Sequence, residues 1–213
     1  MINQHLTSLV LALQDVDSDA PRLQSWGNTA AGVLLAGGRL LACGTGGSVQ
    51  QAAHLAVRLA RAEDDRPPLG AVVLQPAKAV DADAASAGAF ADQVQADGRA
   101  GDLLLCVCAD NTDGELTDAV TAAHEVGMTA WALTGPAPNP LAAACDDTVS
   151  VAAVAPSTAQ EVHLAAINIF CDAVDSAIRD AVRAAETGER RTVRRAGSSP
   201  RIGANWHPQA AHW

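Results

Sequence analysis

The chain has 213 residues, enough for one large domain with a substantial core, and 49% of them are hydrophobic while only 3% are aromatic. Its formal net charge is −10, which argues against direct nucleic-acid binding by the body of the protein, because such binding depends on a basic surface. No apolar run reaches the ~20 residues of a membrane span, and the N-terminus lacks a signal-peptide pattern, so we expect a cytoplasmic protein.

The first 36 residues predict two helices that form an N-terminal helical hairpin. Over residues 5–20 the apolar side chains recur with helical spacing, at Leu6, Leu9, Val10, Leu13 and Val16. Pro21 interrupts that pattern, and a second helix is expected over residues 22–36. The glycine pair at 37–38 then ends this helix, because glycine tolerates the left-handed conformation that closes many helices.

From residue 39 onwards, short apolar runs alternate with helical segments. Strands are expected at residues 39–43, 70–74, 102–107, 129–133 and 147–152. Helices are expected at residues 48–62, 82–97, 114–126, 139–144 and 157–186, with Asp113 and Ser157 as N-caps and Gly127 as the end of the third. The strands do not alternate strictly, which is typical of strands covered on both faces. We therefore predict an α/β fold: a three-layer α/β/α sandwich around a five-stranded parallel sheet, with a long C-terminal helix.

A glycine-rich loop separates the first strand from the helix that follows it. The loop consists of Thr45, Gly46, Gly47 and Ser48, and it directly precedes a helical stretch that contains His54. A strand, a glycine turn and a helix start present backbone N–H groups to an anion. The spacing is neither the dinucleotide fingerprint nor a Walker loop. The loop therefore predicts a site for a phosphorylated small molecule rather than a nucleotide.

Five cysteines lie inside apolar runs, and no two of them have C-x-x-C spacing; they are residues 43, 106, 108, 145 and 171. Cys106 and Cys108 alternate along one expected strand and so share a face. We interpret the five as buried free thiols of a cytosolic chain, with a zinc site or a disulfide as the alternative.

The last 27 residues differ from the rest, so we expect a domain over residues 1–186 and a flexible basic tail over residues 187–213. The tail contains five arginines and one glutamate, a net charge of +4, which leaves −14 for the rest of the chain. No helical or strand period is visible in it. The tail could contact the acidic body, its own oligomer, an acidic partner or nucleic acid, with Trp206 and Trp213 as possible anchors.

Several sequence blocks together resemble the SIS (sugar isomerase) domain family, in particular its phosphoheptose (sedoheptulose-7-phosphate) isomerase branch. The blocks are the glycine loop with His54, residues 65–69, residues 101–105, residues 127–128 with 133–135 and 140–142, and residues 160–163. The resemblance covers about residues 1–183. It implies the SIS fold and a homotetramer whose active sites form between subunits.

The resemblance also implies where the catalytic groups should be. Enzymes of the family place a glutamate four residues after the helix histidine and a second histidine eight residues after the glutamine of the last helix. Those positions are Arg58 and Asn168 here. Arginine does not accept a proton at physiological pH and asparagine does not titrate, so we expect no catalytic residue at either position.

Of four side chains that hold zinc in several family members, only His54 and Gln160 remain in this sequence. One imidazole and one amide are too few for a zinc site, so we expect no metal and no other cofactor.

The loop after the third strand is rich in serine and threonine in the family, whereas residues 108–113 here contain Asp110 and Asp113. Carboxylates would repel a phosphate, although both could cap the following helix instead. Lys78, in the loop after the second strand, could supply a compensating charge. The expected ligand-binding residues are Thr45, Gly46, Gly47, Ser48, His54, Asp110 and Gln160.

Several of these residues have a purely structural alternative. His54 could be a hydrogen-bonded histidine at a subunit interface rather than a ligand. His163, one helical turn after Gln160, is interpreted as a packing residue rather than a catalytic one. Arg58 could pair with Glu161 or Asp172 across an interface, which would stabilise an oligomer and end the chemistry.

The first functional interpretation is therefore a non-catalytic protein of the family. The run from Cys171 to Asp175, together with Asn168, resembles the family's replication-initiator-associating branch. This implies a homotetrameric scaffold for a protein such as the initiator, or a silent subunit in a hetero-oligomer with a related isomerase. The alternatives are an active sedoheptulose-7-phosphate isomerase and a phosphosugar sensor whose pocket is lined by His54, Ser48 and Gln160.

Overall fold

The computed structural model describes residues 2–61, 66–76, 89–110, 114–153 and 155–196. The chain divides into a compact unit, Met1–Arg179, and a second unit, Asp180–Trp213. Among the residues of interest from the sequence, Lys78, Asp113, Trp206 and Trp213 lie outside the described ranges.

Five parallel strands form the central sheet in the order β2-β1-β3-β4-β5. Their bounds are β1 Leu40–Gly44, β2 Ala71–Val73, β3 Leu103–Cys108, β4 Thr129–Thr134 and β5 Asp147–Ser150. Every residue of β1 and of β3 is buried, because helices cover both faces. The predicted α/β fold with its five-stranded parallel sheet is confirmed.

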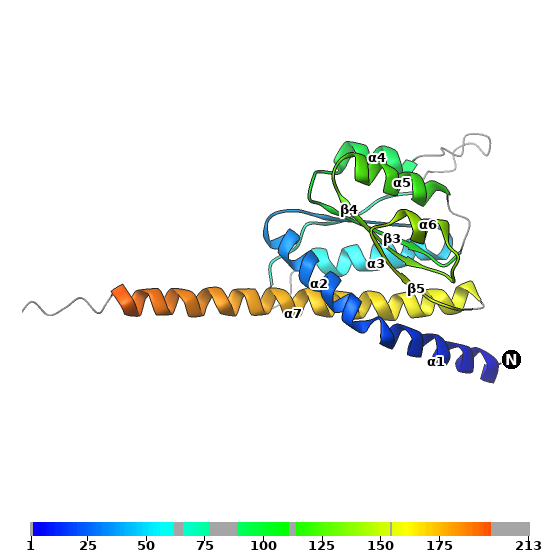
Figure 1. Ribbon diagram of the computed structural model, residues 1–213, viewed down its shortest axis with the longest axis horizontal. Coiled ribbons are helices and arrows are strands. Elements are labelled where there is room, and N and C mark those ends of the chain that lie inside the picture. The colour runs from blue at the N-terminus through cyan, green and yellow to red at the C-terminus, as the bar shows by residue number, and fades with distance from the viewer. Residues whose placement is uncertain (1, 62–65, 77–88, 111–113, 154, 197–213) are drawn as a thin grey trace, which may run out of the picture. The chain divides into compact units, whose positions relative to one another are not determined.

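The described part of the chain contains seven α-helices: α1 Ile2–Ser18, α2 Ala20–Leu35, α3 Val49–Ala60, α4 Ala89–Asp97, α5 Gly114–Glu125, α6 Pro140–Ala144 and α7 Pro156–Ala196. A short 3-10 turn, η1 Gly46–Ser48, precedes α3. Figure 1 shows α4, α5 and α6 on one face of the sheet and α2, α3 and the first part of α7 on the other.

Two hydrophobic clusters follow from this layering. Alternate residues of each inner strand point to opposite faces, so Leu103 and Leu105 belong to one cluster and Leu104 and Cys106 to the other. The first cluster joins α2, α3 and α7, and the second joins α4, α5 and α6. Cys106 and Cys108 share the second cluster, as their spacing predicted.

The two N-terminal helices do not form the expected helical hairpin. One residue, Asp19, separates α1 from α2, and Figure 1 shows the second helix continuing onward from the first. A reversal between antiparallel helices needs a loop of about 2–5 residues. Pro21 still marks the break, because it occupies the first turn of α2.

The last helix differs from expectation at both ends. It begins at Pro156, so Ser157 lies inside the first turn instead of capping the helix. It extends to Ala196, so the first ten residues of the expected tail are helical. Alanine, arginine and glutamate favour helices intrinsically, so a segment rich in them can be helical without an apolar period.

Glycines end two helices as predicted: Gly37 after α2 has a φ of 86° and Gly127 after α5 has a φ of 82°. All five cysteines are free, and four of them are buried, while Cys145 is half-buried. Of the helices that the structure describes, none is both long and apolar enough to cross a membrane.

Candidate functional site

The glycine loop lies at the carboxyl end of β1 and leads directly into α3. Thr45 is extended, the turn η1 starts at Gly46 with a φ of 52°, and Ser48 immediately precedes the helix. The N–H of Ser48 donates to the carbonyl of Thr45 at 2.9 Å, which closes the turn. The start of a helix offers unsatisfied N–H groups and a positive dipole end to an anion. The predicted local geometry is therefore present.

Two glutamines join this loop to α7. An added Cβ atom at Gly47 would lie 2.3 Å from Nε2 of Gln160, so the amide of Gln160 packs directly against the glycine. The Nε2 of Gln51, one turn into α3, donates to the backbone carbonyl of Gln160. Gln51 is buried, and the sequence analysis did not identify it. Its position three residues after Ser48 puts it on the same helix face, which is the signal that could have identified it. The structure thus brings Gln160 to the glycine loop.

The hydroxyl of Ser48 and the Oε1 of Gln51 are polar atoms that this packing leaves unsatisfied. Ser48 is 1% exposed, its Oγ has no hydrogen-bond partner among the residues that the structure describes, and its side chain does not cap α3. A buried hydroxyl without a partner costs free energy of about 1–3 kcal/mol. It therefore remains available for a ligand or a water molecule at the start of the helix.

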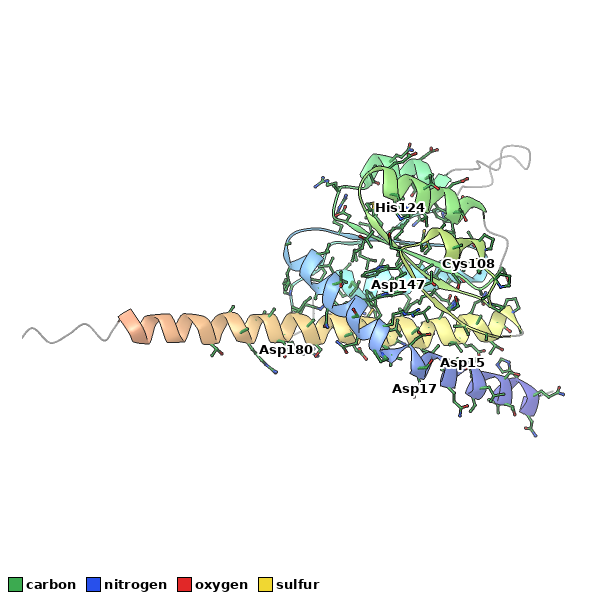
Figure 2. The ribbon with its side chains drawn as sticks, viewed as in Figure 1. Asp15, Asp17, Cys108, His124, Asp147 and Asp180 are labelled. Atoms are coloured by element: carbon green, nitrogen blue, oxygen red, sulfur yellow. The ribbon has the colours of Figure 1, made fainter. Side chains whose placement is uncertain are left out.

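Asp110 lies beyond the carboxyl end of the neighbouring strand β3. Its side chain is exposed, and its backbone carbonyl accepts from Cys108 Sγ at 3.1 Å and from Asn139 Nδ2 at 3.4 Å. Thr45 Oγ1 contacts the same Cys108 sulfur at 3.9 Å, which links the two loops. Figure 2 labels Cys108 in this region. Asp110 thus shares one end of the sheet with the glycine loop.

The family's two catalytic positions meet between α3 and α7. Asn168 Oδ1 lies 3.1 Å from Arg58 Nη1 and 3.2 Å from His54 Nε2. An amide oxygen only accepts hydrogen bonds, so both neighbours donate to it. His54, expected among the ligand-binding residues, is thus held by the side chain of Asn168. We call this line of contacts between α3 and α7 the seam.

Acidic residues of α7 neutralise Arg58. Arg58 Nη2 lies 2.9 Å from Asp172 Oδ1 and 3.9 Å from Asp175 Oδ2. Burial lowers the pKa of Arg58, but the hydrogen bond to Asp172 and the nearby acidic groups outweigh it, and the net pKa is raised. The expected partner Asp172 is confirmed, but the pair lies within one chain and needs no second subunit.

Glu161, the other partner expected for Arg58, contacts His5 instead. Its carboxylate lies 3.2 Å from His5 Nε2, so it joins α7 to α1.

Asp175 also pairs with Arg66, and this pair is buried. Arg66 Nε lies 2.7 Å from Asp175 Oδ1, and both side chains are less than 10% exposed. The guanidinium of Arg66 also donates to the carbonyls of Leu59 at 2.9 Å and Arg58 at 3.1 Å. These are carbonyls of the last turn of α3, where a positive charge is favourable. Arg66 therefore fastens the end of α3 to α7.

His163 is a packing residue, as expected. It is fully buried, and its Nε2 lies 3.0 Å from the carbonyl of Thr134 at the end of β4. Burial lowers the pKa of His163 to about 4, an effect that the hydrogen bond to Thr134 only partly offsets. The imidazole is therefore neutral near pH 7 and fixes α7 to the sheet.

The seam does not fit a zinc ion. His54 is bonded to Asn168, Gln160 lies against Gly47, and the cationic Arg58 stands beside them. Within the described ranges, no three His, Cys, Asp or Glu side chains are placed to hold a metal. Absence of zinc from the purified protein remains a prediction, which metal analysis would check.

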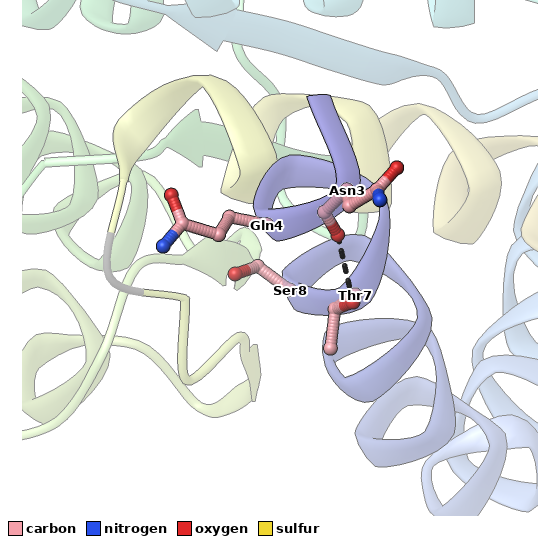
Figure 3. Close-up of a pocket in the computed structure, with 4 residues that line it drawn as sticks. All are labelled: Asn3, Gln4, Thr7 and Ser8. Atoms are coloured by element: carbon pink, nitrogen blue, oxygen red, sulfur yellow. Dashed lines mark hydrogen bonds between the residues drawn. The ribbon is translucent and has the colours of Figure 1, made fainter. Parts of the chain in front are cut away.

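A separate hollow lies on α1, away from these residues in the sequence. It is lined by Asn3, Gln4, Thr7 and Ser8, and Figure 3 shows Thr7 Oγ1 donating to the carbonyl of Asn3 at 2.7 Å. All four are exposed and neutral. The hollow lies at the first turns of α1, and none of its four lining side chains is titratable, so we assign it no chemistry.

Comparisons with known proteins identify the group to which this site belongs. Residues 4–135 match the family described as SIS domain. The chain is 42% identical over 179 residues to a phosphoheptose isomerase of Streptomyces coelicolor, covering 82% of this chain and 78% of that protein. It is 40% identical over 172 residues to a phosphoheptose isomerase of Thiobacillus denitrificans, covering 77% and 87% respectively. The structure of a phosphoheptose isomerase from Francisella tularensis matches with a TM-score of 0.74 at 28% identity, covering 82% of this chain and 96% of that one.

Proposed function

The chain belongs to the SIS domain family, and from that premise we propose that it binds a phosphorylated sugar and interconverts its ketose and aldose forms. The observation that carries this proposal is the 42% identity to a protein named phosphoheptose isomerase over 82% of the chain. The names of such relatives favour the active enzyme over the non-catalytic scaffold that we expected from Arg58 and Asn168. The proposed substrate is sedoheptulose 7-phosphate or a close analogue.

The phosphate is assigned to the glycine loop. Backbone N–H groups at the start of α3 and the unpaired hydroxyl of Ser48 are donors suited to a phosphate. Gln160, packed against Gly47, is placed to contact the sugar beside it. Asp110 lies at the same end of the sheet and disfavours a second anion there, which supports a ligand with one phosphate.

His54 is the group that we assign to proton transfer between the two sugar carbons. Its Nε2 donates to Asn168 Oδ1, so in the neutral ring the other nitrogen, Nδ1, keeps its lone pair. An imidazole nitrogen with a free lone pair can act as a general base. Asn168 fixes the ring and its tautomer, as an orienting group does for many catalytic histidines.

A turnover assay tests the proposal. The purified protein is incubated with sedoheptulose 7-phosphate, with and without added zinc, and formation of the aldose heptose phosphate is measured. Turnover that is independent of zinc is expected, because the seam does not fit the metal. Absence of turnover in both arms, from a protein that the same sugar phosphate stabilises against heat, would overturn the catalytic half and leave the binding half intact.

Ligand binding without turnover is the second candidate, and the network around Arg58 favours it. A guanidinium held by Asn168 and Asp172 occupies the position where the resemblance implies a catalytic carboxylate. In that case the double substitution Arg58→Glu with Asn168→His should produce turnover in a silent protein. If the double variant binds the sugar phosphate and still shows none, the loss of those two groups does not explain the silence.

A homo-oligomer is the proposed assembly. Four apolar side chains of α1 are 38–58% exposed, namely Leu6, Val10, Leu11 and Leu13. Such a stripe on one helix is suited to burial against another chain. Light scattering of the purified protein tests this. A monomer at micromolar concentration would contradict the homo-oligomer, and the apolar side chains of α1 would then be assigned to contact with a different protein, such as a related isomerase or a replication initiator.

A cytoplasmic location is proposed on the strength of the cysteines. All five are free thiols, which reducing compartments maintain. Fractionation of cells that produce the full chain tests this assignment.

A further inference from the structure

Two thiols face each other in the sheet directly below the glycine loop. Cys43 on β1 and Cys106 on β3 are paired in register on neighbouring parallel strands, and their sulfur atoms lie 3.5 Å apart. Both side chains are fully buried in the cluster that contains α4 and α5. Neither takes part in the chemistry proposed above.

The spacing of the two strands meets the Cα requirement of a disulfide. Neighbouring strands lie about 4.8 Å apart, within the range of roughly 4.4–6.8 Å that separates the Cα atoms of most disulfides. A disulfide needs its sulfur atoms at about 2.05 Å, so rotation of the two side chains must close the remaining distance. The two residues are 63 positions apart, so the bond would close a long loop.

We propose that Cys43 and Cys106 form an intrachain disulfide when the protein is exposed to hydrogen peroxide, and that this bond changes the affinity of the glycine loop for its ligand. One thiolate attacks a peroxide oxygen, the O–O bond breaks, and a sulfenic acid forms while hydroxide leaves as water. The second thiol attacks the sulfenic sulfur and releases water as the S–S bond forms. Two thiols are oxidised, one peroxide is reduced, and two waters are produced.

The effect on the loop follows from tight packing at Gly44, the residue after Cys43. An added Cβ at Gly44 would lie 2.8 Å from the carbonyl oxygen of Ser48 and 2.9 Å from that of Val107, which is paired with Gly44 on β3. A small displacement of β1 against β3 therefore reaches Ser48 through direct contacts, because close-packed interiors transmit strain. This regulatory half of the inference rests on the proposed function.

Burial sets the rate and the competing product. A fully buried thiol reacts only with a small oxidant or during local opening, so we expect slow oxidation and a long-lived product. The nearest competitor is Cys145, which is half-buried and whose pKa burial and the proximity of Cys106 both raise. A bond between Cys106 and Cys145 is therefore the outcome that would contradict the assignment.

Peptide mapping of the full chain tests the disulfide. The purified protein is incubated with hydrogen peroxide, free thiols are alkylated in denaturant, and the intact mass and disulfide-linked peptides are measured. The expected result is the loss of two hydrogen masses and one linked peptide joining Cys43 to Cys106, abolished by Cys106→Ala and kept in the control Cys171→Ala. Sulfinic or sulfonic products, a bond to Cys145, or unmodified thiols would overturn it. If Cys106→Ala does not fold, the wild-type map decides alone.

Thermal shift by sedoheptulose 7-phosphate tests the regulatory half. The shift of the unfolding midpoint is compared between the reduced and oxidised protein, and a difference reversed by dithiothreitol is expected. Equal shifts in both forms would overturn the regulation while the mapped bond stands. A shift in neither form would instead count against the proposed function, so the two failures are distinguishable.

Discussion

The two ends of the seam between α3 and α7 are formed by different kinds of chemical group. Near Ser48 and Gly47 the site consists of backbone N–H groups, a glycine contact and one hydroxyl. Near Arg58 and Asn168 it consists of side chains that pair with one another. A backbone-built anion site persists as long as its glycines and the helix start remain, whereas a proton-transfer site changes with a single side chain. Ligand binding and catalysis can therefore diverge along one pair of helices.

The largest expected effect is a loss of turnover without a loss of ligand binding, which distinguishes the two ends of the seam. In the variant His54→Asn, turnover of sedoheptulose 7-phosphate should fall by about 10²–10⁴-fold, because a positioned general base is removed. Stabilisation by the sugar phosphate should persist, because the glycine loop is untouched. Steady-state kinetics and thermal shift are measured on the same preparation. Unchanged turnover would remove His54 from the mechanism.

The ion pairs at the second end differ in burial, which predicts unequal costs. Asp175→Asn should lower the free energy of unfolding by about 3–5 kcal/mol, because it breaks the buried pair with Arg66. The matched control Asp172→Asn should cost no more than about 1 kcal/mol, because that carboxylate is 72% exposed. Urea unfolding measures both. Equal costs would show that burial does not distinguish the two carboxylates.

Acid should weaken the contact between α7 and the sheet through His163. Its pKa is about 4 in the folded chain against about 6.5 when unfolded, so the unfolded state binds more protons between these values. The stability that depends on the neutral ring is fully present above about pH 6.5 and is lost as the pH falls toward 4, by about 3 kcal/mol.

Comparison with His163→Gln isolates this contribution. The difference in unfolding free energy between the wild type and the variant should shrink between pH 7 and pH 4, as followed by urea unfolding at each pH. Parallel curves would assign the acid sensitivity to other groups.

The smallest expected effect concerns the glycine contact at the first end. Gly47→Ala should displace Gln160 and cost about 1 kcal/mol, because the overlapping atoms belong to the end of a flexible side chain. Its clearer signature is a reduced thermal shift with sugar phosphate. The control Gly32→Ala on α2, where an added Cβ meets nothing within 4 Å, should instead stabilise the protein by about 0.5–1 kcal/mol. If the sugar phosphate raises the unfolding midpoint of Gly47→Ala as much as that of the wild type, the position of Gln160 does not matter for ligand binding.

Local patterns predicted most of the fold because each is decided within a few residues. Apolar runs located the strands, and Gly37 and Gly127 ended their helices with positive φ angles, as glycine at a helix end predicts. The errors also have local causes. A single residue, Asp19, joins α1 to α2, and residues of high helix propensity extend α7 to Ala196.

The candidate site was predictable only in part. The glycine loop and Gln160 were identified from their motifs, and their contact is present in the fold. The sequence did not decide which side chains pair with Arg58 and Glu161, because residues 110 or more positions apart meet through tertiary packing alone. Arg66 and Asp175, which fasten the end of α3, gave no chemical signal in the sequence.

The sequence by itself determined the parallel α/β fold and the glycine loop between β1 and α3, because hydrophobic periodicity and glycine spacing act over short distances. Only the tertiary structure decided which charges neutralise Arg58, that Nε2 of His54 lies beside Oδ1 of Asn168, and that the sulfurs of Cys43 and Cys106 lie within 3.5 Å of each other. The physical reason is that pairing of side chains depends on how helices and strands distant in sequence are packed side by side.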